Sequence, residues 1–107
     1  MSIAEVSVDE LAVALDGGAR LVDVREPSEY TEGHVPGAVL IPLGTVGERI
    51  AEFRGDGPLY VICRSGARSM RACEFLEPFG RSGVNVAGGT SAWIRSGRDV
   101  VVGDEPG

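Results

Sequence analysis

The chain has few cysteines, no excess of basic charge and no long apolar run, and each shortage excludes a class of protein. Its 107 residues include two cysteines, Cys63 and Cys73, which are too few for a disulfide scaffold. Neither belongs to a CxxC pair or to a His/Cys cluster of metal-site spacing, so structural zinc is excluded. We therefore expect both thiols to be free, as in a reducing cytoplasm.

The balance of charge and the apolar pattern limit the partners of the chain. Its 16 acidic and 10 basic side chains leave a net charge of -6, whereas a general nucleic-acid binder usually presents a basic face. An anionic substrate would therefore need a local basic pocket. No apolar run approaches the ~20 residues that span a bilayer, and residues 1–15 lack the positive region of a signal or transit peptide. We expect a cytoplasmic protein that binds neither nucleic acid nor membranes.

Short β-branched runs alternate with amphipathic segments along the chain. Several of these runs are apolar on both faces, which is typical of a parallel sheet covered by helices on each side. The length, with no internal repeat or linker, favours a single α/β domain over residues 1–107, with three layers and a four- or five-stranded, mostly parallel sheet. The predicted strands are Arg20–Val24, Ala38–Ile41, Leu59–Cys63 and Val84–Val86, with a fifth candidate near Ile3–Val6.

Helices are predicted from capping signals and from helical periodicity. Ser7-Val8-Asp9-Glu10 is a capping box that opens a helix ending near Asp16. The segments Thr45–Arg54 and Ala67–Phe79 repeat apolar residues at helical spacing, so both are expected to pack as helices on the sheet. The tail Gly103–Gly107 is expected to be frayed. The apolar stripe assigned to the second segment is Ala72, Phe75, Leu76 and Phe79.

The most informative segment joins the strand Leu59–Cys63 to the helix that follows it. Ligands bind at the carboxyl ends of strands in an open α/β sheet, and this edge is where Cys63 is expected. Gly66 allows the loop to curl around the sulfur, so that backbone N–H groups and the helix N-terminus face it. Arg64 and Arg68 add positive charge when they turn inward. Because such surroundings lower a cysteine pKa to roughly 3.5–7.5, Cys63 is the predicted nucleophile.

The two cysteines have different alternatives. Cys63 would be a small buried apolar residue in the simplest interpretation, but a loop with two arginines does not suit a core. Cys73 flanks the apolar stripe of its helix, three residues before Leu76, and has no basic neighbour on that face. We therefore assign Cys73 to core packing.

Three motifs follow one another along nearly the whole chain. They are Asp23-Val24-Arg25-Glu26-Pro27 with Glu29-Tyr30, Gly33-His34-Val35-Pro36-Gly37-Ala38 and Ile41-Pro42; the loop Cys63-Arg64-Ser65-Gly66-Ala67-Arg68-Ser69; and Gly88-Gly89 with Ala92-Trp93. In this order they resemble the signatures of the rhodanese family of sulfurtransferases, and the chain looks like a single-domain member with a rhodanese-like fold. One departure is Leu40, where the family most often has asparagine, which could alter hydrogen bonding beneath the site.

The resemblance implies transfer of a sulfane sulfur through a persulfide on Cys63, without a cofactor or a metal. The donor would be a small anion such as thiosulfate, and the acceptor cyanide or a thiol. Phosphatase or arsenate reductase chemistry is disfavoured, because Cys-x5-Arg phosphatases have one more residue between cysteine and arginine. A persulfide carrier or regulatory module that serves a protein partner is the alternative. The residues expected to bind the substrate are Arg64, Ser65, Gly66, Ala67, Arg68 and Ser69.

Residues outside the loop are given supporting roles. Asp23 is expected at the same sheet edge as the cysteine, where it orients the loop or pairs with an arginine, and Arg25 is expected to pair with Glu26 or Glu29. A Cys/His pair would suggest protease chemistry, but the resemblance makes His34 a loop anchor.

The segment around Gly88-Gly89 is expected to form a turn and a helix start. It lacks the spacing of a dinucleotide fingerprint, so no nucleotide cofactor is implied. Trp93 is assigned to the core.

Overall fold

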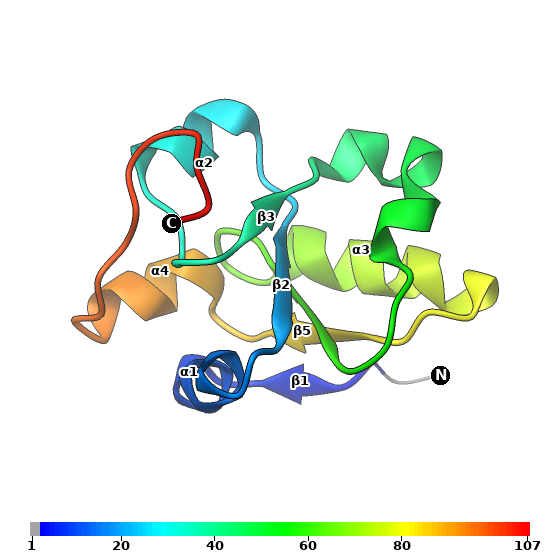
Figure 1. Ribbon diagram of the computed structural model, residues 1–107, viewed down its shortest axis with the longest axis horizontal. Helices are drawn as coiled ribbons and strands as arrows, with labels where there is room; N and C mark the ends of the chain where they lie inside the picture. The colour runs from blue at the N-terminus through cyan, green and yellow to red at the C-terminus, as the bar shows by residue number, and fades with distance from the viewer. Residues whose placement is uncertain (1–2) are drawn as a thin grey trace.

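The computed structural model describes residues 3–107 as a five-stranded sheet with every pairing parallel, in the order β1-β5-β4-β2-β3 (Figure 1). The predicted α/β class and mostly parallel sheet are confirmed, and the strands fall where they were expected, most of them with shorter bounds. The strands are β1 Glu5–Val6, β2 Arg20–Asp23, β3 Val39–Leu40, β4 Leu59–Ile62 and β5 Gly83–Val86. The α-helices are α1 Val8–Asp16, α2 Pro27–Glu32, α3 Ala67–Leu76 and α4 Gly89–Arg95.

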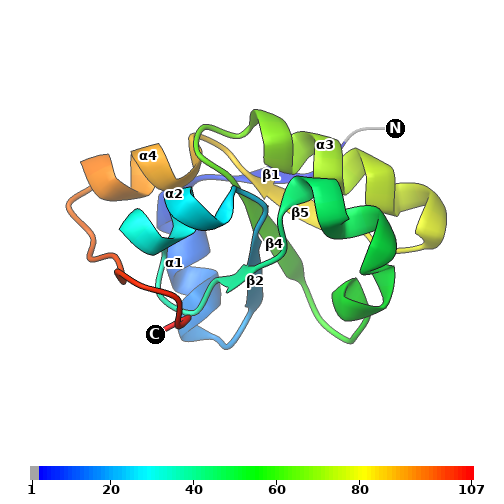
Figure 2. The same ribbon diagram turned by 90° about the horizontal axis from the view of Figure 1, so that it is seen from above.

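Two layers of helices cover the sheet, one on each face (Figure 2). Successive side chains of a strand point to opposite faces, and β4 shows this division. Val61 packs in the cluster that contains residues of α3. Ile62 packs in the opposite cluster, which contains residues of α1, α2 and α4. The three central strands are therefore buried on both sides, as their apolar runs predict.

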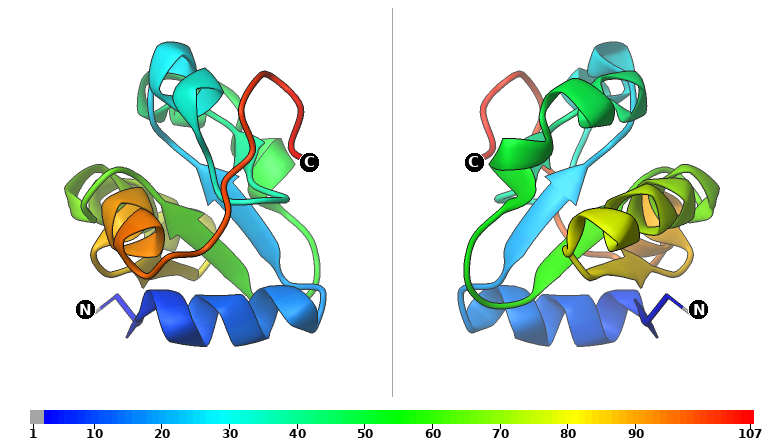
Figure 3. Two further views of the ribbon diagram at one scale, coloured as in Figure 1. Left: turned by 90° about the vertical axis from the view of Figure 1, so that its left-hand side faces the viewer. Right: turned by 90° about the vertical axis from the view of Figure 1, so that its right-hand side faces the viewer.

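The capping box at Ser7 forms as expected and begins α1. The Ser7 hydroxyl accepts a hydrogen bond from the Glu10 backbone N–H at 3.1 Å, and the Glu10 carboxylate accepts one from the Ser7 N–H at 2.9 Å. Two of the orphan donors at the start of the helix are thereby satisfied. The helix lies along one edge of the molecule, beneath the sheet in the views of Figure 3.

The single helix predicted over Thr45–Arg54 is wrong. The structure has two 3-10 helices there, η1 Leu43–Glu48 and η2 Ile50–Phe53, which meet at Arg49. Glycines inside η1, at Gly44 and Gly47, weaken a continuous α-helix because glycine has a low helix propensity. Val46 and Phe53, two of the apolar residues of this segment, are nevertheless buried in the part of the core that faces α3.

The helix predicted from Ala67 is confirmed, but its buried stripe differs from the expected one. Ser69, Ala72, Cys73 and Leu76 are the buried residues of α3, and they follow the i, i+3, i+4, i+7 pattern of one helical face. Phe75 and Phe79 lie at the margin of this face and remain 45% and 53% exposed. The last turn, η3 Glu77–Phe79, is a 3-10 helix.

Cys73 packs in the core, as assigned. Its side chain is fully buried, and a Cβ on Gly83 of β5 would lie 2.9 Å from its sulfur. Burial, with the nearby charges of Glu77 and Glu74, raises the pKa of the Cys73 thiol to about 12. This cysteine is therefore an inert thiol at neutral pH.

The C-terminal segment is held against the domain, where the sequence suggests a frayed tail. It runs beside α2 (Figure 3), and the N–H of Gly103 donates to the Thr31 carbonyl at 2.9 Å. The N–H of Gly37 donates to the Pro106 carbonyl at 2.8 Å. Among residues 3–107, no helix has the length and apolar character needed to cross a membrane.

Candidate active site

Cys63 lies directly after β4, at the carboxyl edge of the sheet. Asp23, the last residue of β2, is the register partner of Ile62, and the N–H of Val24 donates to the Ile62 carbonyl at 3.0 Å. Asp23 and Cys63 therefore share one sheet edge, as expected. The Cys63 side chain is only 1% exposed.

The loop after Cys63 curls around the sulfur because of Gly66. This glycine has φ of +114°, in the left-handed region that residues with a Cβ avoid, and it caps the N-terminus of α3. Its N–H donates to the Cys63 Sγ at 3.1 Å. From the first turn of α3, the Ser69 hydroxyl lies 3.3 Å from the same sulfur, within hydrogen-bond distance. Of the backbone donors predicted around Cys63, the Gly66 N–H thus makes a hydrogen bond to the sulfur, and the Ser69 hydroxyl is a second potential donor.

These donors shift the thiol toward its charged form. Burial by itself raises the pKa of Cys63, but the hydrogen bond from the Ser69 hydroxyl and those from the backbone N–H groups of Ser69, Gly66 and Ser65 outweigh it. The pKa of Cys63 consequently lies below its ordinary value of 9.0. The two cysteines thus differ in reactivity, since the pKa of Cys73 is raised.

The first turn of α4 holds the outer side of this loop. The Thr90 N–H and hydroxyl both donate to the Cys63 carbonyl at 2.9 Å, and the Ser91 N–H donates to the Arg64 carbonyl at 3.0 Å. A trans peptide points its C=O and N–H in opposite directions. Anchoring the Cys63 and Arg64 carbonyls on α4 therefore turns the N–H groups of the loop away from α4.

Gly89 makes this approach of α4 to the loop feasible. Its φ is +56°, and a Cβ on it would lie 2.6 Å from the carbonyl oxygens of Cys63 and Arg64. A side chain there would push the helix away from the loop.

The two arginines of the loop have different surroundings. Arg68 donates from both terminal nitrogens to the Glu29 carboxylate, at 2.7 and 2.9 Å. The side-chain hydrogen bond from Arg68 holds the pKa of Glu29 at about 2, against an ordinary 4.5. Arg64 is exposed, and within residues 3–107 no carboxylate lies at ion-pair distance from it. Arg64 thus carries the unbalanced positive charge of the loop.

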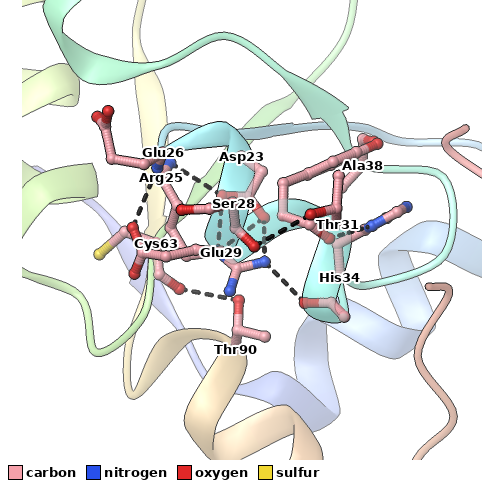
Figure 4. A network of polar contacts seen from close by, with 12 residues as sticks. Asp23, Arg25, Glu26, Ser28, Glu29, Thr31, His34, Ala38, Cys63 and Thr90 are labelled. Atoms are coloured by element: carbon pink, nitrogen blue, oxygen red, sulfur yellow. Dashed lines mark hydrogen bonds and ion pairs between the residues drawn. The ribbon is translucent and has the colours of Figure 1, made fainter. Parts of the chain in front are cut away.

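Asp23 and Arg25 form a buried ion pair at the carboxyl end of β2 (Figure 4). Arg25 Nη2 donates to the Asp23 carboxylate at 2.9 Å and also to the Gly33 carbonyl at 2.9 Å. The pairing expected of Asp23 is therefore present, whereas Arg25 pairs with Asp23 and not with Glu26 or Glu29. Alternate residues of an extended chain point the same way, which brings these two side chains together. The sulfur of Cys63 points away from this pair in Figure 4.

These features, a cysteine in a loop of donors after a central parallel strand, agree with the comparisons with known proteins. The sequence model described as Rhodanese-like domain matches residues 7–96. The chain belongs to this family. A sulfurtransferase of Allochromatium vinosum is 40% identical to the chain over 83 residues, which cover 76% of the chain and 77% of that protein.

Further relatives extend the match over most of this rhodanese-like domain. A chloroplastic thiosulfate sulfurtransferase of Arabidopsis thaliana is 33% identical over 105 residues, covering 86% of the chain and 88% of that protein. The crystal structure of a rhodanese-like domain protein from Staphylococcus aureus has a TM-score of 0.83 at 33% identity, covering 94% of this chain and 98% of that one. The rhodanese-like fold and the sulfurtransferase family are thereby established.

In the rhodanese-like domain, His34 anchors loops and Trp93 packs in the core, as expected. His34 is buried, stacks on Tyr30 with ring centroids 3.6 Å apart, and contacts the carbonyls of Tyr30 and Glu105 at 2.8 Å. Trp93 packs in the core cluster with α1 and donates from Nε1 to the Asp99 carbonyl at 2.9 Å. His34 therefore holds α2 and the C-terminal segment together, and Trp93 fixes the segment that follows α4.

The unusual Leu40 leaves the neighbouring backbone bonds intact. It packs at the edge of the core cluster on the α1 side. The Ile41 N–H donates to the Asp23 carbonyl at 2.9 Å, and the Leu43 N–H donates to the Val24 carbonyl at 3.0 Å. Main-chain bonds thus hold β3 to β2 whatever side chain occupies position 40.

A cleft of about 190 Å³ opens beside the loop, between α2 and α4. Arg64 and Ser91 line it, together with the buried Arg25 and the carboxylate-bearing Glu29 and Glu32. The cleft thus gives a small polar molecule access to the neighbourhood of the loop. Within the described part of the chain, no group of three or more His, Cys, Asp or Glu residues has metal-site geometry.

Three parts of the site, namely α2, Thr90 and Asn85, are not predicted from the sequence. The helix α2 carries Glu29, and two local signals in the sequence indicate it. They are Pro27 at its first position and a capping box in which the Glu29 carboxylate accepts a hydrogen bond from the Glu26 N–H. The role of Thr90 depends on the close approach allowed by Gly89. Asn85 is a polar residue inside the apolar strand β5, and a polar side chain at such a position is a sequence signal of a buried contact.

Proposed function

We propose that this rhodanese-like domain moves a sulfane sulfur from a small anionic donor, such as thiosulfate, to cyanide or a thiol through a persulfide on Cys63. The observation that supports this most directly is the cysteine sulfur at the centre of donors from Gly66 and Ser69. Donors fixed in a buried site favour an anion on sulfur, because charge-assisted hydrogen bonds are stronger than neutral ones.

In the first half-reaction, the Cys63 thiolate attacks the outer sulfur of thiosulfate. A bond forms between the two sulfurs, and sulfite leaves with the electron pair of the broken sulfur–sulfur bond. The terminal sulfur of the resulting persulfide carries the negative charge that the N–H groups of the loop can bind. The exposed Arg64 guanidinium attracts the anionic donor toward the mouth of the site.

In the second half-reaction, the acceptor attacks the outer sulfur of the persulfide. Cyanide becomes thiocyanate, or a thiolate becomes a new persulfide, and Cys63 leaves as the thiolate. A leaving thiol departs faster when its pKa is low. The donors that lower the Cys63 pKa therefore assist formation of the Cys63 thiolate in the first half-reaction and its departure from the persulfide in the second. Arg68, which is paired with Glu29, holds the loop against α2.

The test is sulfite release in the absence of any acceptor. A double displacement predicts a burst of about one sulfite per protein molecule and then arrest, since the persulfide cannot be discharged. Cys63→Ser should release none, whereas Cys73→Ser is the matched control and should give the full burst. The absence of a burst with wild-type protein would exclude thiosulfate as the donor, and hydrolysis of an aryl phosphate would favour the phosphatase alternative.

A further inference from the structure

A chain of buried polar side chains leads from the nucleophile across the sheet to β1. Asn85 of β5 is 1% exposed, and its Cα is in register with Glu5 of β1 on one side and Val61 of β4 on the other. The Ser69 hydroxyl lies 3.3 Å from the Cys63 sulfur and 2.5 Å from Asn85 Oδ1. A buried amide so close to the nucleophile has no role in the reaction described above.

The neighbours of Asn85 determine which way its amide points. Its Nδ2 donates to the Glu5 carboxylate at 2.8 Å and to the Gly66 carbonyl at 3.2 Å. Both of these groups only accept hydrogen bonds, so the nitrogen must face them. The oxygen of the Asn85 amide therefore faces Ser69 as an acceptor.

The Ser69 hydroxyl has one proton and more than one acceptor. Asn85 Oδ1 lies at 2.5 Å, whereas the Cys63 sulfur and the Gly66 carbonyl both lie at 3.3 Å. A neutral thiol sulfur is a weak acceptor, and an amide oxygen is a better one. A thiolate or persulfide anion reverses this order, because its bonds are charge-assisted.

We propose that Asn85 is a positioning residue that competes with the Cys63 sulfur for the proton of the Ser69 hydroxyl. The inference rests on the proposed role of Cys63 and adds a regulator of the same site. While the sulfur is neutral, the hydroxyl donates to Asn85. When the sulfur becomes anionic, the hydroxyl turns to it and Asn85 Oδ1 loses its partner. Asn85 thus limits how strongly Ser69 favours the anion, and Glu5 holds the amide in the competing orientation.

The test is a double-mutant cycle on the Cys63 pKa, measured from the pH dependence of thiolate absorbance and of iodoacetamide alkylation. Cys73, with a pKa of about 12, does not titrate in the range used. Asn85→Ala removes the competing acceptor, so the Cys63 pKa should fall by about 0.5 to 1, the equivalent of one neutral hydrogen bond. Ser69→Ala should raise the pKa.

The double variant distinguishes a path through Ser69 from a general effect on the fold. With Ser69→Ala already present, Asn85→Ala should no longer lower the Cys63 pKa, because no hydroxyl proton is left for the two acceptors to share. The bond from Asn85 Nδ2 to the Gly66 carbonyl is lost in both backgrounds, so it does not produce a difference between them. An unchanged or raised pKa in Asn85→Ala alone, or an equal shift in both backgrounds, would overturn the proposal. The charged groups around the loop, Arg68 with Glu29 and Arg25 with Asp23, are the same in every variant.

A surface variant covers the case in which Asn85→Ala does not fold. Glu5→Gln keeps an oxygen acceptor for Asn85 Nδ2 but removes its charge, which weakens the hold on the amide. The Cys63 pKa should fall more with Ser69 present than in the Ser69→Ala background, and equal falls would overturn the inference. Sulfite release by the wild-type protein is measured separately, so loss of the proposed activity and failure of the cycle give different results.

Discussion

Replacing Gly89 with alanine tests whether α4 shapes the cysteine loop. The added Cβ would lie 2.6 Å from the carbonyl oxygens of Cys63 and Arg64, and both are backbone atoms that cannot rotate away. The helix must therefore withdraw from the loop. Three hydrogen bonds are weakened by this movement, two from Thr90 to the Cys63 carbonyl and one from Ser91 to the Arg64 carbonyl.

The expected loss of stability combines two effects. A Cβ at a left-handed backbone position is unfavourable by about 1–2 kcal/mol. Weakening three neutral hydrogen bonds adds about 2–3 kcal/mol. Gly89→Ala should therefore lower the free energy of unfolding by about 3–5 kcal/mol, and the Cys63 pKa should rise as the loop N–H groups lose their alignment.

Gly97→Ala is the matched control for this variant. Gly97 also has a positive φ, +84°, but a Cβ there meets nothing within 4 Å. Only the conformational penalty of about 1–2 kcal/mol should appear. Urea unfolding gives the free energies, and the rate of iodoacetamide alkylation reports the Cys63 thiolate. Equal losses of stability in the two variants, with unchanged alkylation of Cys63, would refute the role assigned to α4.

Three further predictions concern the charged groups and the tail. The folded pKa of Glu29 is about 2, whereas its ordinary value is 4.5. The stabilisation of the fold by the Glu29 carboxylate is therefore present above pH 4.5 and is lost as the pH falls toward 2. Glu29→Gln should remove this part of the pH dependence of the free energy of urea unfolding, about 0.5–1 kcal/mol after solvent screening. Arg64→Ala should raise KM for thiosulfate several-fold, most at low ionic strength, and an unchanged KM in steady-state assays would remove its assigned role. Deleting residues 103–107 should lower the free energy of unfolding by about 2 kcal/mol, because bonds to His34, Gly37 and Thr31 are lost; an unchanged Tm would mean that the tail is frayed in solution.

The features that the sequence predicts well are local ones. The capping box at Ser7, the strand that leads to Cys63 and the turn at Gly66 each involve residues within a few positions of one another. Their geometry follows from backbone preferences and short-range hydrogen bonds. The contrast between Cys63, whose pKa is lowered, and Cys73, whose pKa is raised, is also local, since it depends on the loop and the helix that carry them.

The features that the sequence does not predict arise from contacts between distant segments. Arg68 meets Glu29 only because α2 and α3 reach the same sheet edge, and their residues are 39 positions apart. Ser69 meets Asn85 through the pairing of β4 with β5, and no pattern within either segment encodes that register. The exposure of Phe75 likewise depends on which elements cover α3. In each case the sequence shows the residue type, but the contact that the residue makes depends on the tertiary structure.

Intact-mass measurement after incubation with thiosulfate tests directly whether Cys63 alone carries the transferred sulfur. The wild-type protein and Cys73→Ser should each gain the mass of one sulfur atom, and added cyanide should remove it. Cys63→Ser should gain nothing. A sulfur adduct that persists in Cys63→Ser, or that is absent from the wild-type protein, would show that Cys63 is not the sulfur carrier.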